Sequence, residues 1–135
     1  MEVSRADLQA LAETRLQDAQ VLLAQQRFSA AYYLSGYAVE LAMKACIAKK
    51  IRPETIPDKG FISSVFSHDL KGLAGLAVLA DLMKAEAQAN PAFRDNWVQA
   101  CEWNEQSRYQ VWSESQARTM VESISDATDG VLQWV

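Results

Sequence analysis

The chain has 135 residues, half of them hydrophobic and 22% charged, and a formal net charge of −4. This length fits one domain that buries roughly two-thirds of the surface of its unfolded chain, and we expect a single domain over residues 1–135. The acidic balance excludes a simple nucleic-acid coat, because no overall attraction to phosphate exists, and leaves room only for a local basic patch.

The sequence contains no signal peptide and no long apolar run, so we expect a cytoplasmic protein. Its two cysteines, Cys46 and Cys101, lack the spacing of a metal site. Free cysteine is among the most buried residue types. We therefore expect two buried, unpaired thiols.

The first predicted helix begins at Ser4, whose hydroxyl can cap the amide of Asp7 while Asp7 caps in return. Apolar residues then recur three or four apart up to Leu23, which predicts one apolar face. Gln25 to Arg27 ends the helix. Phe28 and Ser29 form a short turn, and so short a connection makes the next helix an antiparallel neighbour.

The second predicted helix, around residues 30–48, is the central one. Leu34, Ala38, Leu41, Ala45 and Ala48 form its apolar stripe. A neighbouring stripe carries polar tips, in the order Tyr33, Tyr37, Glu40 and Lys44. Glu40 precedes Lys44 by four residues, the favourable order for an ion pair within a helix. Because two faces carry large side chains, we expect this helix to be contacted from several sides.

Proline and glycine between Pro53 and Gly60 predict a loop after this helix. Its apolar residues, Phe61, Ile62, Val65 and Phe66, are expected to pin it to the bundle. Ser67 is a plausible cap for a third helix that reaches Asn90.

Asn90-Pro91 separates the third helix from a short fourth helix that reaches Cys101. Residues 102–112 show weak periodicity and are interpreted as an irregular link. Ser113 and Gln116 form a second capping box, and the last helix carries apolar residues from Ala117 to Val131. With no strand-like alternation or internal repeat, the sequence predicts an all-α, up-and-down bundle of about five helices.

The run from Ala30 to Ala45 resembles the second helix of HEPN domains, which are small helical domains. Two shorter matches follow, at Ser67-His68-Asp69-Leu70 and from Trp103 to Arg108-Tyr109. Together they extend over most of the chain. The resemblance implies a helical fold and, since HEPN domains typically pair, a two-fold homodimer whose arginine-bearing segments face each other across a cleft.

HEPN ribonucleases resemble one another in an arginine followed, four to six residues later, by a histidine. Arg108 matches the arginine, but the histidine positions hold Ser113, Glu114 and Ser115. None of these can replace an imidazole as a general base near neutral pH. We therefore expect no RNA cleavage, and interpret Arg108 either as a structural partner of a carboxylate such as Glu40 or as an anion-binding residue.

His68 is the only histidine. It is interpreted as a helix cap or surface residue, with a base or phosphate contact as the alternative. The tyrosine stripe is more typical of packing than of a ligand shelf. Glu40 is expected to be buried and satisfied by Arg108, Lys44 or His68, because an unpaired buried charge is costly.

The resemblance implies a binding module that acts beside a nucleotidyltransferase-like partner of the MNT type, in a toxin–antitoxin or related system. The alternatives are a ribonuclease that uses Arg108 with an atypical partner such as His68, or a structural subunit without a ligand.

Candidate ligand-binding residues are Arg108, Tyr109, Lys44, His68, Glu40 and Tyr37, and the ligand class is a nucleotide, RNA or another phosphate-bearing molecule. We expect no cofactor, no metal site and no membrane contact. An aromatic patch of Trp97, Trp103, Tyr109 and Trp112 is expected at the dimer interface.

Overall fold

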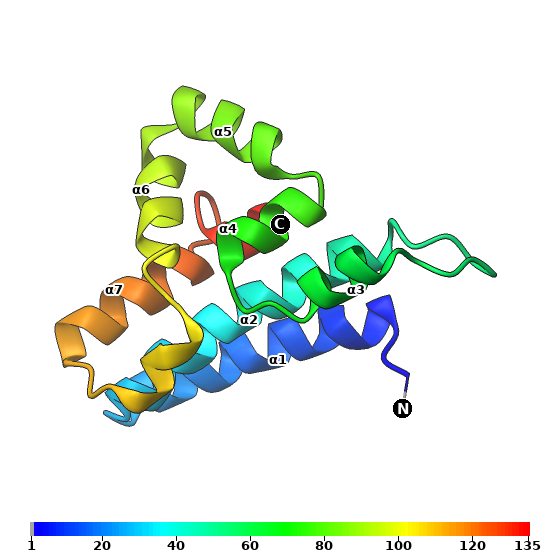
Figure 1. Cartoon of the computed structure of the whole chain (residues 1–135). Helices are drawn as coiled ribbons and strands as arrows, with labels where there is room; N and C mark the ends of the chain where they lie inside the picture. Colours follow the sequence, from blue (N-terminus) through cyan, green and yellow to red (C-terminus); the bar gives the residue numbers. More distant parts are fainter. Residues whose placement is uncertain (1) are drawn as a thin grey trace.

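The computed structural model describes residues 2–135, which form eight α-helices and one 3₁₀ helix without a strand (Figure 1). The all-α prediction is confirmed, although the helices are more numerous than expected. A long antiparallel pair, α1 (Arg5–Ala24) and α2 (Phe28–Ala48), lies along one side of the molecule. Ser4 and Asp7 form the predicted capping box at the start of α1.

Helix α2 is the centre of the fold, as the sequence predicts. It contacts α1, α4, η1, α7 and α8. Ala31, Ala38, Val39, Met43 and Ile47 are fully buried along it. Small and apolar side chains on several faces therefore allow neighbours to pack on several sides of the helix.

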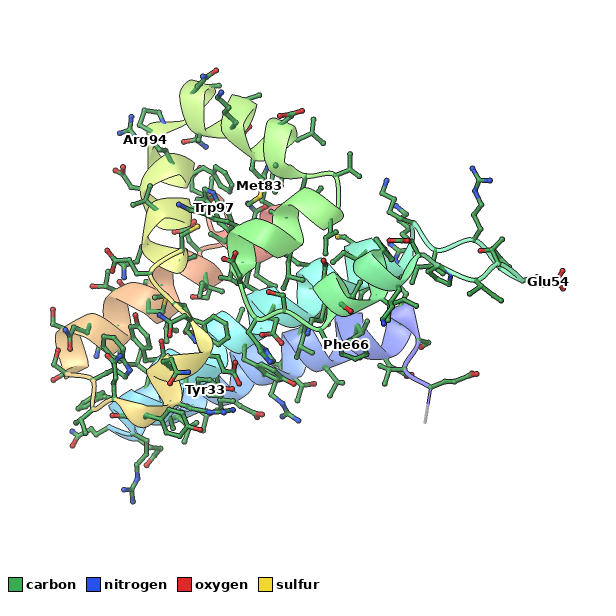
Figure 2. The ribbon with its side chains drawn as sticks, viewed as in Figure 1. Tyr33, Glu54, Phe66, Met83, Arg94 and Trp97 are labelled. Carbon is green, nitrogen blue, oxygen red and sulfur yellow. The ribbon has the colours of Figure 1, made fainter. Side chains whose placement is uncertain are left out.

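The segment between α2 and α4 contains a helix where the sequence pattern predicts a loop. Asp58 accepts a hydrogen bond from the amide of Phe61 and so caps α3 (Lys59–Val65). The chain before Asp58 extends away from the bundle, with Glu54 near its tip (Figure 2). Phe61 and Val65 pack against the core as expected, but Ile62 and Phe66 are exposed. Only one face of so short a helix can reach the bundle.

The predicted third helix is divided into α4 (Leu70–Leu76) and α5 (Ala80–Ala89). The break lies at Val78, whose φ of 59° is incompatible with a right-handed helix. Ser67 does not cap α4, because its hydroxyl accepts from the amide of Asp69, which itself occupies the N-cap position.

In the last third of the chain the predicted N-caps are present, but the predicted final helix is divided in two. Asn90 caps α6 (Pro91–Ala100), and Ser113 caps α7 (Glu114–Ser125). The predicted link contains a 3₁₀ helix, η1 (Glu105–Tyr109), with its own capping box at Asn104. The predicted final helix breaks at Asp126, whose carboxylate accepts from the amides of Thr128 and Asp129. A short α8 (Val131–Trp134) follows.

The expected exposed aromatic patch is largely wrong. Trp103 is only 3% exposed, and Trp97 and Trp112 are half-buried. Trp112 stacks on Tyr32 with 3.7 Å between ring centroids. Of the expected patch only Tyr109 is exposed, at 70%. Trp97, Trp103 and Trp112 all pack in or against the core of the bundle.

The two cysteines are free, as expected, but each is only half-buried. The thiol of Cys46 lies 3.7 Å from the carbonyl oxygen of Val135. Across residues 2–135, no helix combines the length and the apolar character needed to cross a membrane.

Candidate functional site

Glu40, on the inner side of α2, is the most deeply buried charged residue of the candidate set. Its side chain is 2% exposed. One carboxylate oxygen lies 3.3 Å from Nζ of Lys44, one turn further along the helix, and the other lies 2.7 Å from Nδ1 of His68. The prediction of a buried carboxylate satisfied by a cation is confirmed.

His68 lies in the turn between α3 and α4, with its side chain 41% exposed. It does not cap a helix, because Asp69 occupies the N-cap position of α4, but it is a surface residue, the other part of that interpretation. While Nδ1 contacts Glu40, Nε2 lies 3.7 Å from Oε2 of Glu105 on η1. The buried Glu40 therefore fixes the orientation of the imidazole, and the other ring nitrogen faces the surface.

Arg108, near the end of η1, does not pair with Glu40 as one interpretation expected. Both oxygens of Glu40 already have partners, and Arg108 is exposed. Its Nη2 lies 3.2 Å from Oε1 of Glu105, and its guanidinium carbon lies 4.8 Å above the ring of Tyr109. The neighbouring Tyr109 hydroxyl, with a smaller contribution from Tyr33, raises the pKa of Arg108 above its ordinary value. The guanidinium remains charged at any physiological pH.

Five side chains thus form one continuous series, which we call the charged chain: Lys44, Glu40, His68, Glu105 and Arg108. Basic groups and carboxylates alternate along it from the buried middle of α2 to the surface of η1. Sequence reasoning missed Glu105. Its spacing of three from Arg108 is a recognisable helical pair, but only the fold brings His68 to it.

Trp103 places η1 against α2. Its indole nitrogen donates a hydrogen bond of 3.0 Å to the carbonyl oxygen of Tyr33. The indole lies on Gly36, where a Cβ atom would overlap the ring. Glycine at this one position therefore allows the close approach that carries Glu105 and Arg108 to the charged chain.

The tyrosine stripe of α2 serves mainly in packing, as expected. Tyr33 and Tyr37 stack with 6.2 Å between ring centroids, and Tyr33 also packs against Trp103 at 5.7 Å. Burial, followed by the charge of Glu40, raises the pKa of the Tyr37 phenol. Tyr37 therefore stays neutral beside the charged chain.

A cavity of about 500 Å³ lies beside the charged chain. It is lined by His68, Asp69, Cys101, Trp103, Asn104, Glu105 and Gln106. Burial raises the pKa of the Cys101 thiol to about 11, so that this group is neutral near pH 7. Amide, carboxylate and imidazole groups around the cavity suit a polar ligand.

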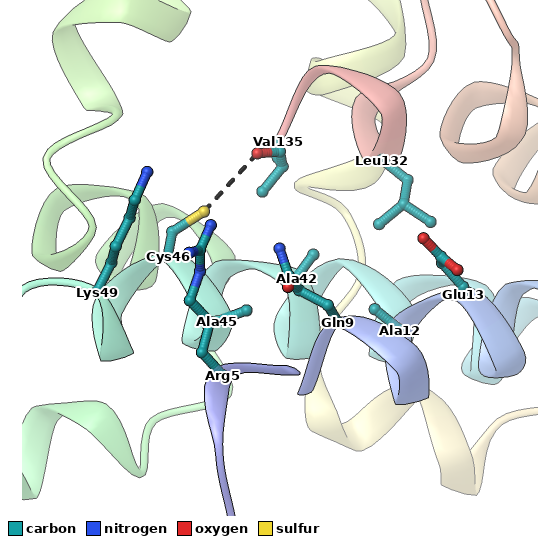
Figure 3. Close-up of a pocket in the computed structure, with 10 residues that line it drawn as sticks. All are labelled: Arg5, Gln9, Ala12, Glu13, Ala42, Ala45, Cys46, Lys49, Leu132 and Val135. Atoms are coloured by element: carbon teal, nitrogen blue, oxygen red, sulfur yellow. Dashed lines mark hydrogen bonds between the residues drawn. The ribbon is translucent and has the colours of Figure 1, made fainter. Parts of the chain in front are cut away.

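A second cavity, of about 360 Å³, lies where α1, α2 and α8 meet (Figure 3). It contains Arg5 and Lys49 but none of the candidate ligand-binding residues. In the part of the chain that is described, no three His, Cys, Asp or Glu side chains are grouped so that they could hold a metal ion.

The family model of the HEPN domain matches residues 7–135. No curated protein sequence and no solved structure matches the chain. The match extends over nearly the whole length, including α2, His68 and the η1 segment that carries Arg108. The chain therefore belongs to the HEPN domain family.

Proposed function

We propose that this chain is a dimeric HEPN-type binding module that takes a nucleotide or another phosphate-bearing ligand at Arg108. The observation that carries the proposal is the position of Arg108. Its exposed guanidinium lies above the ring of Tyr109 and contacts Glu105, whose carboxylate also contacts His68. A guanidinium is well suited to phosphate, since its donors match pairs of phosphate oxygens.

The candidate residues divide by exposure. Arg108, Tyr109 and His68 reach the surface, whereas Glu40 is buried and Lys44 is only 17% exposed. We assign ligand contact to the first three. On the buried side, Lys44 contacts Glu40 and Glu40 contacts His68, so that both help to hold the imidazole in place. Tyr37 supports them through packing.

A binding role fits better than cleavage because of the residues that follow Arg108. Ser113 caps α7, with its hydroxyl accepting from the amide of Gln116, and Glu114 pairs with Arg118. These side chains serve the start of a helix, and none is an imidazole that could transfer a proton near neutral pH.

The proposal includes a homodimer and a partner protein. HEPN domains often pair, and the exposed Tyr109 and Val111 beside Arg108 offer apolar surface to a second copy. A two-fold axis at this end would bring two copies of Arg108 together. The nucleotidyltransferase-like partner, and a role in a toxin–antitoxin or related system, are supported by the family resemblance alone.

Light scattering and a nucleotide titration test the proposal. We expect a mass near twice the chain's 15.0 kDa at micromolar concentration. We also expect binding of adenosine 5′-monophosphate that is lost in Arg108→Ala. Arg118→Ala is the matched control, because Arg118 forms an exposed pair of the same 3.2 Å length with Glu114. A monomer, or equal binding by both variants, would contradict the proposal.

A ribonuclease with an atypical site is the second candidate, and one observation favours it. Glu40 orients His68 through Nδ1 and leaves Nε2 at the surface, facing the same carboxylate as Arg108. A carboxylate-oriented imidazole beside an arginine is an arrangement that can serve in general base catalysis.

A further inference from the structure

Two exposed basic groups of the charged chain, the guanidinium of Arg108 and the imidazole of His68, share one carboxylate. Oε1 of Glu105 lies 3.2 Å from Nη2 of Arg108, and Oε2 of the same group lies 3.7 Å from Nε2 of His68. The two groups come from different elements, η1 and the turn before α4, so that the carboxylate lies between them. A phosphate group would present pairs of oxygens to the same guanidinium and imidazole in the same way.

We propose that Glu105 is an internal occupant of an anion site, and that the phosphate of a nucleoside monophosphate displaces its carboxylate when it binds between Arg108 and His68. This inference rests on the proposed function, which it deepens by naming the ligand class and the residue that competes with it. Glu105 is thereby a residue that sets affinity and specificity.

The side chains of Arg108 and His68 are both held in place independently of Glu105. His68 contacts the buried Glu40 through Nδ1 at 2.7 Å, so its Nε2 continues to face outward when the carboxylate leaves. Arg108 lies over Tyr109, which supports the guanidinium through a cation–π contact. The site is therefore pre-formed, and only one side chain has to move.

The carboxylate of Glu105 is able to move. Its side chain is 37% exposed, and water can solvate it after displacement. Exposed ion pairs of this kind contribute little free energy because solvent screens them. A phosphate monoester carries more negative charge than a carboxylate near neutral pH, and it therefore has the electrostatic advantage in the exchange.

The neighbouring cavity of about 500 Å³ limits which phosphate-bearing molecules fit the site. Glu105 and His68 are among the residues that line it, and Asn104 and Gln106 add side-chain amides. Amides pair with the donors and acceptors on the edge of a nucleobase. A nucleoside attached to the bound phosphate fits this volume.

Calorimetric titration with adenosine 5′-monophosphate, and separately with inorganic phosphate, tests the inference. Glu105→Gln keeps the size of the side chain and removes its charge. We expect it to bind both anions about fivefold more tightly than the unaltered chain, the factor that corresponds to the loss of one competing exposed ion pair. Glu114→Gln, which removes the same charge from the pair with Arg118, should leave both affinities unchanged.

Nuclear magnetic resonance of the His68 ring gives a second, direct readout. Phosphate added to the unaltered chain should shift the Nε2 signal in the direction opposite to the shift caused by Glu105→Gln, because phosphate replaces the carboxylate with a larger negative charge whereas glutamine removes the charge. Equal or weaker binding by Glu105→Gln, with binding that still requires Arg108, would overturn the internal occupant and leave the proposed function in place. No binding by either protein would overturn both. Glu105→Ala repeats the test if the glutamine variant melts early.

Discussion

Glu40 and His68, 28 residues apart, are joined by a contact of 2.7 Å between a buried carboxylate oxygen and Nδ1 of the imidazole. The contact ties the middle of α2 to the turn before α4. Glu40 is almost inaccessible to water, so its charge depends on His68 and Lys44 for stabilisation. The same contact aims the other nitrogen of His68 at Glu105. Structural support and site geometry therefore depend on one pair.

Replacement of Glu40 should be costly. Glu40→Ala leaves Lys44 without its carboxylate and releases the orientation of His68. We expect a loss of about 3 kcal/mol in the free energy of unfolding, the cost typical of removing one partner from a buried pair. Urea denaturation measures it. Glu114→Ala, at an exposed pair, is the control and should cost less than about 1 kcal/mol; a similar cost for both variants would contradict the burial argument.

Gly36→Ala should destabilise the protein although alanine normally favours a helix. The added methyl group overlaps the ring of Trp103. Overpacking of this kind costs about 2 kcal/mol. Gly75→Ala is a matched control in α4, because nothing lies within 4 Å of its Cβ position, and it should be neutral or stabilising. Thermal melting, together with tryptophan fluorescence, would show whether the indole has moved; an unchanged melting temperature for Gly36→Ala would be the contrary result.

Val78→Gly should stabilise the protein. Val78 is exposed and has a φ of 59°, a conformation that a β-branched residue adopts only with strain. Glycine relieves about 1 kcal/mol of that strain, against a smaller entropic loss. Val111→Gly removes another exposed valine side chain, at a position outside the left-handed region, and it should not raise the melting temperature. A decrease for Val78→Gly would refute the prediction.

Purified protein incubated with a mixed pool of RNA should leave the RNA intact, because no histidine follows Arg108 at the family spacing. Gel analysis over several hours measures this, with a heat-denatured sample as the control for contaminating nucleases. Cleavage that disappears in both Arg108→Ala and His68→Gln would reverse the conclusion and support the ribonuclease with an atypical site.

Cys101 should react slowly with iodoacetamide. Burial raises the pKa of its thiol from 9.0 to about 11, and only the thiolate is nucleophilic. In Cys46→Ser, where Cys101 is the remaining thiol, we expect a rate at pH 8 about a hundredfold below that of an ordinary cysteine, the factor that two pKa units imply. The rate should rise with pH up to about 11. A rate like that of free cysteine would show that the thiol is not shielded.

Local signals in the sequence determined much of the fold. Ser4 with Asp7, and Ser113 with Gln116, form their capping boxes as predicted, because each cap depends on residues within three positions of one another. Apolar periodicity located α1 and α2, and burial of Glu40 followed from its place among the large side chains of α2. The run in α2 also indicated the family, which the match over residues 7–135 confirms.

Only the tertiary structure decided which charges meet. Glu40 pairs with His68 across 28 residues, and Glu105 joins His68 to Arg108, because Gly36 lets Trp103 bring η1 against α2. The break between α4 and α5 lies at Val78, and neither Val78 nor its two chain neighbours is a proline or glycine that would predict it. The tryptophans expected in an exposed patch are largely buried in gaps that several helices create together. Such outcomes depend on packing between distant segments, and no pattern within a single segment contains that information.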